Sequence, residues 1–240
     1  MEIKYHANNK IREFYPLVNG LRHGIASYWD ENGIKWSESD WCLGKRHGLH
    51  IIWNDKGIII YQCTWENDIK SGKEIGYNDN GIDYEYDWRL DNNTCIEKQW
   101  HANGNLAYSC RHNMSKVLNN KGTGLFRDIY PNPNRYCDFS KNGQEDEYWE
   151  NGHLKSRTFW LDGKQYGKSK TWYVNGNIQT IKNYRNGVAI YSVMFQKNGK
   201  KIYETIDDLQ NRKCTRIQYD ECGKKKNEQC YIDGILMKES

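Results

Sequence analysis

The chain has 240 residues and a mass of 28.5 kDa, yet only 37% of its residues are hydrophobic and its mean hydropathy is −1.00. So low an apolar content argues against a thick two-layer core. Aromatic residues make up the deficit, because 10 Trp, 18 Tyr and 5 Phe account for 14% of the chain, which excludes ordinary disorder. The net charge of +4 is too small to attract a phosphate backbone, so no nucleic-acid partner is expected.

Signals for export or membrane insertion are not found in the sequence. No run approaches the roughly 18 to 20 apolar residues that cross a bilayer, and residues 1–6 lack the apolar core of a signal peptide. The eight cysteines contain no CxxC pair, and the chain is far longer than small disulfide-stapled scaffolds. We therefore expect a soluble, cytoplasmic protein with reduced thiols. A disulfide between Cys222 and Cys230 across the last hairpin is the alternative.

A glycine recurs at a nearly constant interval along the whole chain, in most cases after an asparagine. The positions are Gly33, Gly57, Gly81, Gly104, Gly152, Gly176, Gly199 and Gly223. The steps between them are 24, 24, 23, 48, 24, 23 and 24 residues, where 48 is two periods. Ten units of 24 residues fill all 240 positions, which predicts a repeat architecture and leaves no room for a separate catalytic domain.

The repeats form a single predicted domain, 1–240, with three stretches of different regularity. Residues 1–104 hold regular repeats, residues 105–152 irregular ones, and residues 153–240 regular to degenerate ones. A second glycine column, nine residues before the first, places an insertion of about five residues near 111–122 and a deletion of similar size after Tyr136. The central repeats therefore depart from the regular spacing twice, first by the insertion and then by the deletion.

Two further columns are aromatic. Asn9 and Pro133 stand at the glycine position of the two remaining units. Four residues before the repeat glycine or its replacement stand Tyr5, Trp29, Trp53, Tyr77, Trp100, Ile129, Tyr148, Trp172, Phe195 and Tyr219. Seven or eight residues after it stand Trp41, Trp65, Trp88, Trp160, Tyr184 and Tyr231. On a strand, the position six before the glycine shares a face with the aromatic four before it, and it holds Ile51, Ile75, Val193 and Ile217. We therefore predict that the aromatic four before the glycine faces the core.

Each unit is predicted to be one β-hairpin. Asn-Gly supplies the positive φ values of a type I′ turn, and the flanking runs of polar, β-compatible sequence have the length of strands. Stacked hairpins give an all-β fold, an elongated, twisted antiparallel β-meander of about ten tandem 23–24-residue repeats. Its predicted structural residues are Trp29, Trp53, Tyr77, Trp100, Trp172 and Tyr219, and Gly33, Gly57, Gly81, Gly104, Gly152 and Gly176.

The runs GLRHG at 20–24 and GKRHG at 44–48, each followed by an aromatic strand and a turn, resemble MORN repeats of a short variant. The resemblance covers essentially the whole chain, with departures at Cys95, Ile190 and Cys214, which replace a glycine. Proteins built from this variant include antitoxin-like or immunity-like proteins of bacteria and repeat proteins of giant viruses. The resemblance implies hairpin repeats, and MORN arrays serve as scaffolds, dimerisation modules and membrane-associated adaptors.

Patterns that carry catalysis or bind metals are not found. The sequence contains neither GxSxG nor GxxxxGK[ST], and a one-layer sheet lacks the water-excluding pocket that catalysis uses. His47 and His50 lie three residues apart, a spacing that sends strand side chains to opposite faces and argues against a metal pair. We expect a non-enzymatic protein with no catalytic residue, no metal ligand and no cofactor.

Three functional hypotheses stay open. The first is an array that binds another protein, toxin-like or an assembly component, and neutralises it as an antitoxin or immunity protein does. The second is a MORN-type scaffold or membrane-associated adaptor, viral in origin, with lipid among its partners. The third is a binder of carbohydrate or another ligand through exposed Trp side chains. Self-association through sheet edges is a further alternative.

Regular repeats present the same surface many times, so we expect specificity where the array departs from itself. The irregular stretch supplies the candidate partner-binding residues, Tyr130, Glu145, Glu147, Tyr148 and Trp149. Two prolines stiffen the turn beside Tyr130, while the acidic run and the adjacent aromatics offer charge and binding anchors. The alternative interpretation is a frayed or bent repeat without a binding role.

Overall fold

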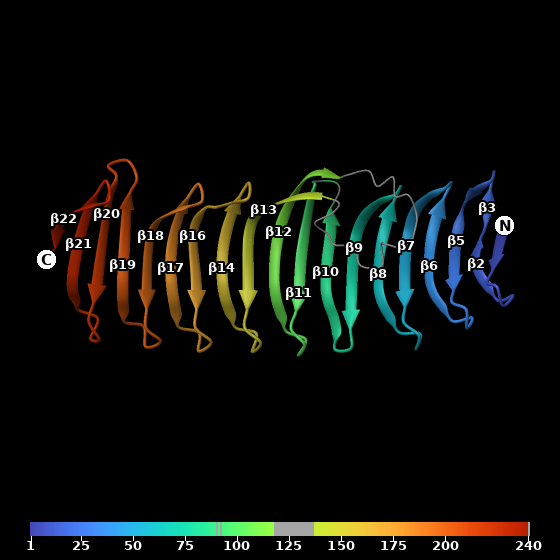
Figure 1. Ribbon diagram of the computed structural model, residues 1–240, viewed down its shortest axis with the longest axis horizontal. Helices are drawn as coiled ribbons and strands as arrows, with labels where there is room; N and C mark the ends of the chain where they lie inside the picture. The colour runs from blue at the N-terminus through green and yellow to red at the C-terminus, as the bar shows by residue number, and fades with distance from the viewer. Residues whose placement is uncertain (90, 92, 118–136, 240) are drawn as a thin grey trace. The chain divides into compact units, whose positions relative to one another are not determined.

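The computed structural model describes residues 1–89, 91, 93–117 and 137–239. Within these ranges, strands that follow one another along the chain pair antiparallel, hairpin after hairpin (Figure 1). This arrangement confirms the predicted all-β meander of hairpin repeats.

The chain folds as two compact units. Unit 1 comprises Met1–Gly104 and His112–Phe139, and unit 2 comprises Asn105–Arg111 and Ser140–Ser240. Unit 1 contains β1 (Glu2–Tyr5), β2 (Ile11–Tyr15), β3 (Leu17–Val18), β4 (Leu21–Arg22), β5 (Gly24–Trp29), β6 (Lys35–Cys42), β7 (Lys45–Trp53), β8 (Ile59–Glu66), β9 (Ile69–Asn78), β10 (Gly81–Arg89) and β11 (Thr94–Trp100).

Unit 2 contains β14 (Leu154–Leu161), β15 (Lys164–Gln165), β16 (Gly167–Trp172), β17 (Ile178–Arg185), β18 (Val188–Phe195), β19 (Lys201–Asp208), β20 (Lys213–Tyr219), β21 (Lys225–Ile232) and β22 (Ile235–Glu239). Two strands, β12 (Leu106–Val117) and β13 (Cys137–Tyr148), contain residues of both units.

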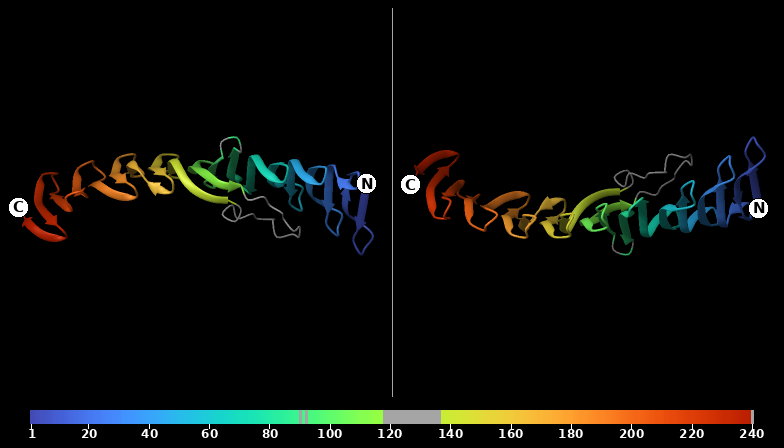
Figure 2. Two further views of the ribbon diagram at one scale, coloured as in Figure 1. Left: turned by 90° about the horizontal axis from the view of Figure 1, so that it is seen from above. Right: turned by 90° about the horizontal axis from the view of Figure 1, so that it is seen from below.

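Neighbouring strands are joined in chain order within each unit. In unit 1 the order runs β1, β2, β5 and then β6 to β11, while β3 and β4 pair as a separate short ribbon in the β2–β5 connection. In unit 2, β14 pairs with both β15 and β16, and the order continues to β22. Within each unit successive strands rotate relative to one another (Figure 2), which is the normal twist of an antiparallel sheet.

The turns that contain the repeat glycine are not type I′ turns. After β5, Gly33 has a φ of 85°, whereas Asn32 does not have a positive φ. The Gly33 N–H donates to Asp30 O (3.0 Å), and the Asp30 N–H donates to Ile34 O (2.9 Å). This is the three-residue loop, a type I turn followed by a left-handed glycine, so the predicted turn type was wrong. An Asp30 Oδ1 that accepts from the N–H groups of Asn32 and Ile34 fixes the loop.

Type I′ turns close the opposite ends of the strands. Leu43 and Gly44 between β6 and β7 have φ values of 46° and 81°, and Asn186 and Gly187 between β17 and β18 have values of 51° and 84°. Two successive positive φ values are the mark of this turn. Gly44 and Gly187 each follow a repeat glycine by eleven residues and belong to a different glycine column.

The core of unit 1 lies mostly on one face of its sheet, with Ile75 (8% exposed) buried on the other. Ile52 and Tyr61 are cross-strand partners and are 6% and 7% exposed, and Trp65 further along β8 is 8% exposed. Trp53 follows Ile52 directly, so it lies on the other face, where it is only half-buried. None of the described residues four before a repeat glycine is buried, so the prediction that this column faces the core was wrong. These residues stand at strand ends, where fewer neighbours cover them.

Among the described residues, unit 2 buries fewer apolar side chains than unit 1. Val193 is 2% exposed, and the hydroxyl oxygens of Thr158 and Ser169 lie 3.0 Å apart in a buried pair. In the last hairpins Cys230 pairs across the strands with Thr215, while Cys222 lies in the turn before β21. The alternative disulfide required the two thiols to lie opposite each other across the hairpin. They do not.

Candidate functional site

A row of aromatic side chains follows the turn edge of unit 1. Trp29, Trp53 and Tyr77 end or nearly end the strands β5, β7 and β9, and all three are half-buried. The Lys35 ammonium lies 5.9 Å from the ring centroid of Trp29 and 6.0 Å from that of Trp53. One cation therefore contacts both indoles by cation–π attraction and links neighbouring repeats.

Isoleucines extend the row into the turns. Ile34, Ile58 and Ile82 each follow a repeat glycine and are 37%, 58% and 38% exposed. Ile82 is the cross-strand partner of Tyr77. Ile34 and Ile58 directly precede Lys35 and Ile59, the cross-strand partners of Trp29 and Trp53. We call Trp29, Trp53, Tyr77, Ile34, Ile58 and Ile82 the aromatic row.

Polar contacts fix the cation of this row. Lys35 Nζ donates to Glu38 Oε1 (2.5 Å), and Ser27 Oγ donates to the same oxygen (3.0 Å). Ser27 is 6% exposed, so the carboxylate of Glu38 is held at the sheet from one side while Lys35 reaches over the rings. The position of Lys35 is therefore set before any partner arrives.

Unit 2 repeats the lysine contact but not the isoleucines: Lys201 Nζ donates to Glu204 Oε2 (2.8 Å) and lies 5.3 Å from the ring centroid of Tyr219. The residues that follow its repeat glycines are polar, namely His153, Asn177, Lys200 and Lys224. Their side chains, or those of the preceding asparagines, reach the backbone of the next turn, as when Asn177 Nδ2 donates to Lys197 O (2.7 Å). The apolar edge is consequently a property of unit 1 among the described turns.

The opposite face of unit 1 buries a carboxylate with its partners. Glu74 is 2% exposed, and its Oε1 accepts from Lys70 Nζ (2.6 Å) and from the Tyr61 hydroxyl (3.0 Å). Its Oε2 accepts from Trp88 Nε1 (2.8 Å). Because each oxygen has a donor, this buried charge is compensated, and it belongs to the framework of the sheet.

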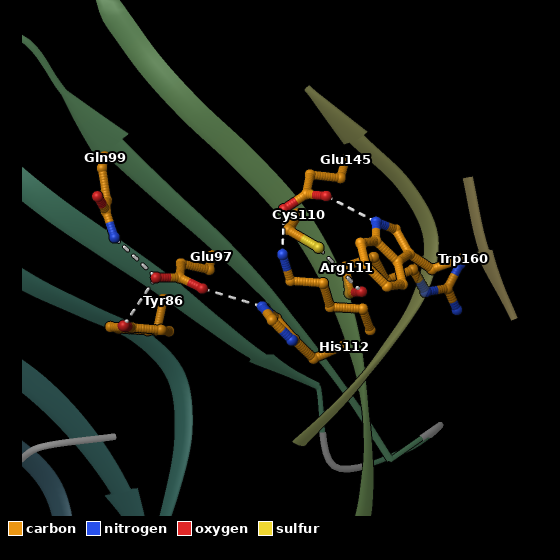
Figure 3. A network of polar contacts seen from close by, with 9 residues as sticks. Tyr86, Glu97, Gln99, Cys110, Arg111, His112, Glu145 and Trp160 are labelled. Atoms are coloured by element: carbon orange, nitrogen blue, oxygen red, sulfur yellow. Dashed lines mark hydrogen bonds and ion pairs between the residues drawn. The ribbon is translucent and has the colours of Figure 1, made fainter. Parts of the chain in front are cut away.

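Glu97 in unit 1 and Glu145 in unit 2 are further carboxylates that neighbouring side chains hold by hydrogen bonds (Figure 3). In unit 1, Glu97 accepts from Tyr86 (3.2 Å) and Gln99 (2.9 Å) and bonds His112 Nε2 (2.9 Å). Burial raises the pKa of Glu97, but the hydrogen bonds from His112, Gln99 and Tyr86 outweigh it and the pKa is lowered. Burial next to this charge raises the pKa of Tyr86. The carboxylate therefore stays ionised while the phenol stays protonated.

Comparison with known proteins matches one of these hairpins to a family. Residues 165–186 match the model of the MORN repeat variant, a segment that spans β16, the turn after it and β17. This segment of the chain is similar to a MORN repeat. No curated protein matches the chain significantly.

Some solved structures resemble its fold at low similarity. They include TcdB2-TccC3-Cdc42 and TcdB2-TccC3-TEV, each 10% identical with a TM-score of 0.23, over 95% and 99% of this chain. A Photorhabdus luminescens Tc holotoxin pore is also 10% identical, with a TM-score of 0.19 over 87% of this chain. The chain spans only 13% to 15% of the length of these proteins.

The residues predicted to bind a partner do not form one patch on the hairpin β13–β14. Glu145 is 8% exposed, with Trp160 Nε1 donating to its Oε2 (2.6 Å) and Lys141 pairing with its Oε1 (Figure 3), so it is a buried framework residue like Glu74. Its replacement would disturb the fold, contrary to the expectation of a surface charge.

The other predicted residues lie nearer the surface. Glu147 pairs with Lys155 (3.4 Å), whose ammonium lies 5.3 Å from the ring centroid of Trp149. Tyr148 lies on the opposite face, where its hydroxyl donates to Asp146 Oδ2 (3.3 Å). Tyr130 lies outside the described residues. Glu147 and Trp149 thus share a cluster through Lys155, and Glu145 and Tyr148 do not belong to it.

The ranges that the structure describes contain no cluster of three or more His, Cys, Asp or Glu side chains with suitable geometry. His50 Nδ1 lies 2.5 Å from Ser39 Oγ, while His47 is exposed. In the same ranges no helix is long and apolar enough to span a membrane.

Proposed function

We propose that this chain is a non-enzymatic, cytoplasmic array that binds another protein and neutralises it, in the manner of an antitoxin or immunity protein. The aromatic row of unit 1 carries this proposal. Trp and Tyr side chains flanked by aliphatic ones are the usual anchors of protein interfaces, and Lys35 adds charge at the centre. MORN repeats, as scaffolds of repeated hairpins, supply the rigid support.

The geometry of the row suits an extended protein partner. Trp29, Trp53 and Tyr77 recur at a spacing of 24 residues, so equivalent anchors repeat along one edge. A partner that contacts two or three of them gains affinity from each without needing a deep pocket. The same repetition also favours the alternative role, a scaffold that holds several copies of one component.

Catalysis is not part of the proposal. The buried acids Glu74, Glu97 and Glu145 are all held by donors from neighbouring strands, and burial raises the pKa of the Cys63 thiol to about 11. A thiol with so high a pKa is a poor nucleophile at neutral pH. These groups therefore serve the sheet.

The test begins with the identity of the partner. The full chain is expressed with an affinity tag in its native host, and cross-linked partners are identified by mass spectrometry. The purified partner is then titrated by calorimetry against the wild type and Ile58→Asp. We expect Ile58→Asp to weaken binding about tenfold or more, because it places a charge among the apolar anchors.

A matched control comes from unit 2. Val174 is exposed to a similar degree as Ile58, at 54% against 58%, and stands in a turn without the aromatic row. Val174→Asp should bind as the wild type does. Loss of binding in Val174→Asp with retention in Ile58→Asp would contradict the proposed surface. Restored activity of a toxic partner on adding Ile58→Asp in place of wild type would support neutralisation over scaffolding.

A further inference from the structure

Six polar side chains form a regular grid on one face of β19, β20 and β21 in unit 2. Tyr203 pairs across the strands with Gln218, which pairs with Asn227. The next row, two residues along each strand, consists of Thr205, Arg216 and Gln229, paired in the same order. Since alternate residues share a face, all six side chains lie on the same side of the sheet.

The grid encloses a hollow. A groove of about 370 Å³ is lined by Tyr203, Thr205, Arg216, Gln218, Asn227 and Gln229. The lining contains hydroxyl, amide and guanidinium groups and not one aliphatic side chain. Such a surface offers hydrogen-bond donors and acceptors at closely spaced points.

The corresponding positions of unit 1 are filled. Tyr61 and Cys63 follow Gly57 by the same four and six residues as Tyr203 and Thr205 follow Gly199. Tyr61 and Cys63 are 7% and 1% exposed and belong to the core. Arg216 and Gln218, by contrast, are exposed. The same site of the repeat is thus packed in one unit and is open and polar in the other.

The groove carries positive charge. The Arg216 guanidinium carbon lies 4.9 Å from the ring centroid of Tyr231, within the range of cation–π attraction, and the side chain is exposed. Hydrogen bonds from Ser192 and Thr205 lower the pKa of Tyr203, and the charges of Lys182 and Arg216 add to this effect. Asp207 also lies near Arg216 and raises the pKa of the guanidinium, as does Cys214 more strongly.

We propose that this groove binds a carboxylate-bearing saccharide, such as a hexuronate residue of an acidic glycan. Arg216 pairs with the carboxylate through its fork of N–H donors. The amides of Gln218 and Asn227, Thr205, and the Gln229 amide nitrogen hydrogen-bond the ring hydroxyls, each of which both donates and accepts. Gln229 Oε1 instead accepts from the Tyr231 hydroxyl (2.9 Å). An acidic peptide fits less well, because its aliphatic carbons would meet no apolar surface. This ligand site lies in unit 2 and is independent of the aromatic row.

The full chain is titrated with sodium glucuronate. Binding is monitored by the NMR signals of the side-chain amides of Gln218, Asn227 and Gln229. Glucose and N-acetylglutamate serve as probes that keep only the hydroxyls or only the carboxylate. We expect the amide signals to shift with glucuronate at lower concentration than with either single-feature probe. Arg216→Gln should weaken glucuronate binding about tenfold.

Two further variants keep the result interpretable. Arg185→Gln removes the same charge from an exposed position at the end of β17 and should bind glucuronate as the wild type does. Gln218→Ala, at an exposed position, should weaken binding severalfold with an unchanged circular dichroism melt. Tighter binding of N-acetylglutamate, equal binding of glucose, or undiminished binding by Arg216→Gln would each overturn the proposal.

Discussion

The ring of Tyr84 lies directly over Gly76, so close that a Cβ on Gly76 would come within 2.2 Å of Tyr84 Cε1. The two residues are cross-strand partners in β9 and β10, and Gly76 pairs on its other side with Tyr61. The absence of a side chain at Gly76 gives the Tyr84 ring the space to lie over the strand. The aromatic face of unit 1 therefore depends on a missing side chain.

Replacement of Gly76 by alanine is expected to destabilise the protein by about 1–3 kcal/mol through overpacking. Tyr84→Ala removes the obstacle, so the double variant Gly76→Ala/Tyr84→Ala should be more stable than the sum of the two single effects predicts. Urea unfolding of the four proteins measures this coupling. Additive effects would show that the ring does not press on residue 76.

The two tryptophan columns are expected to differ in their contribution to stability. Trp65 is 8% exposed and its ring centroid lies 3.7 Å from the guanidinium carbon of Arg46, while Trp53 is half-buried on the other face. Trp65→Ala should cost about 3–5 kcal/mol and Trp53→Ala clearly less. Thermal unfolding of both variants checks the order, and a larger loss for Trp53→Ala would contradict the assignment of the core face.

The assignment of the core face shows which parts of the fold could be predicted from the sequence. The glycine period identified hairpins and their number, because a turn residue every two strands is a local requirement. Alternation separated the two faces of each strand, but it could not say which face is covered. Coverage depends on neighbours such as Tyr61 and Trp88, which come from other strands, and on distance from the turn, where Trp53 lies.

The type of the turns and the burial of Glu145 could not be predicted from the sequence for related reasons. Asn-Gly fits a type I′ turn as well as a type I turn with a following left-handed glycine, and the side chain of Asp30 decides between them. Glu145 was expected at the surface within a charged run. Lys141, four residues earlier and on the same face, was a signal of its buried pairing, but the contribution of Trp160 needed the register of the next strand.

Removal of the buried carboxylate in unit 1 is expected to be costly. Glu74→Ala leaves Lys70, Tyr61 and Trp88 without their shared acceptor, and breaking a buried ion pair in this way costs about 3–5 kcal/mol. Glu66→Ala, at an exposed position of β8, should change stability by less than about 0.5 kcal/mol. Urea midpoints of the two variants make the comparison. Equal midpoints would mean that the donors find water once the acid is gone.

The stability of unit 1 is expected to depend on pH through His50. Burial, with the positive charges of Arg46 and Lys70, lowers the pKa of His50 to about 4 in the folded protein, from an ordinary value of 6.5. The unfolded chain therefore binds the proton first as the pH falls. The contribution of neutral His50 is complete above pH 6.5, declines between pH 6.5 and 4, and amounts to about 3 kcal/mol in all.

His50→Gln isolates this contribution because glutamine does not titrate. The difference in unfolding free energy between wild type and His50→Gln should change by that amount between pH 7 and pH 4, with the wild type losing more stability toward acid. His23→Gln, at an exposed position, keeps His50 and should follow the wild-type curve. A pH-independent difference between wild type and His50→Gln would show that His50 is protonated in the folded protein over the same range as in the unfolded chain.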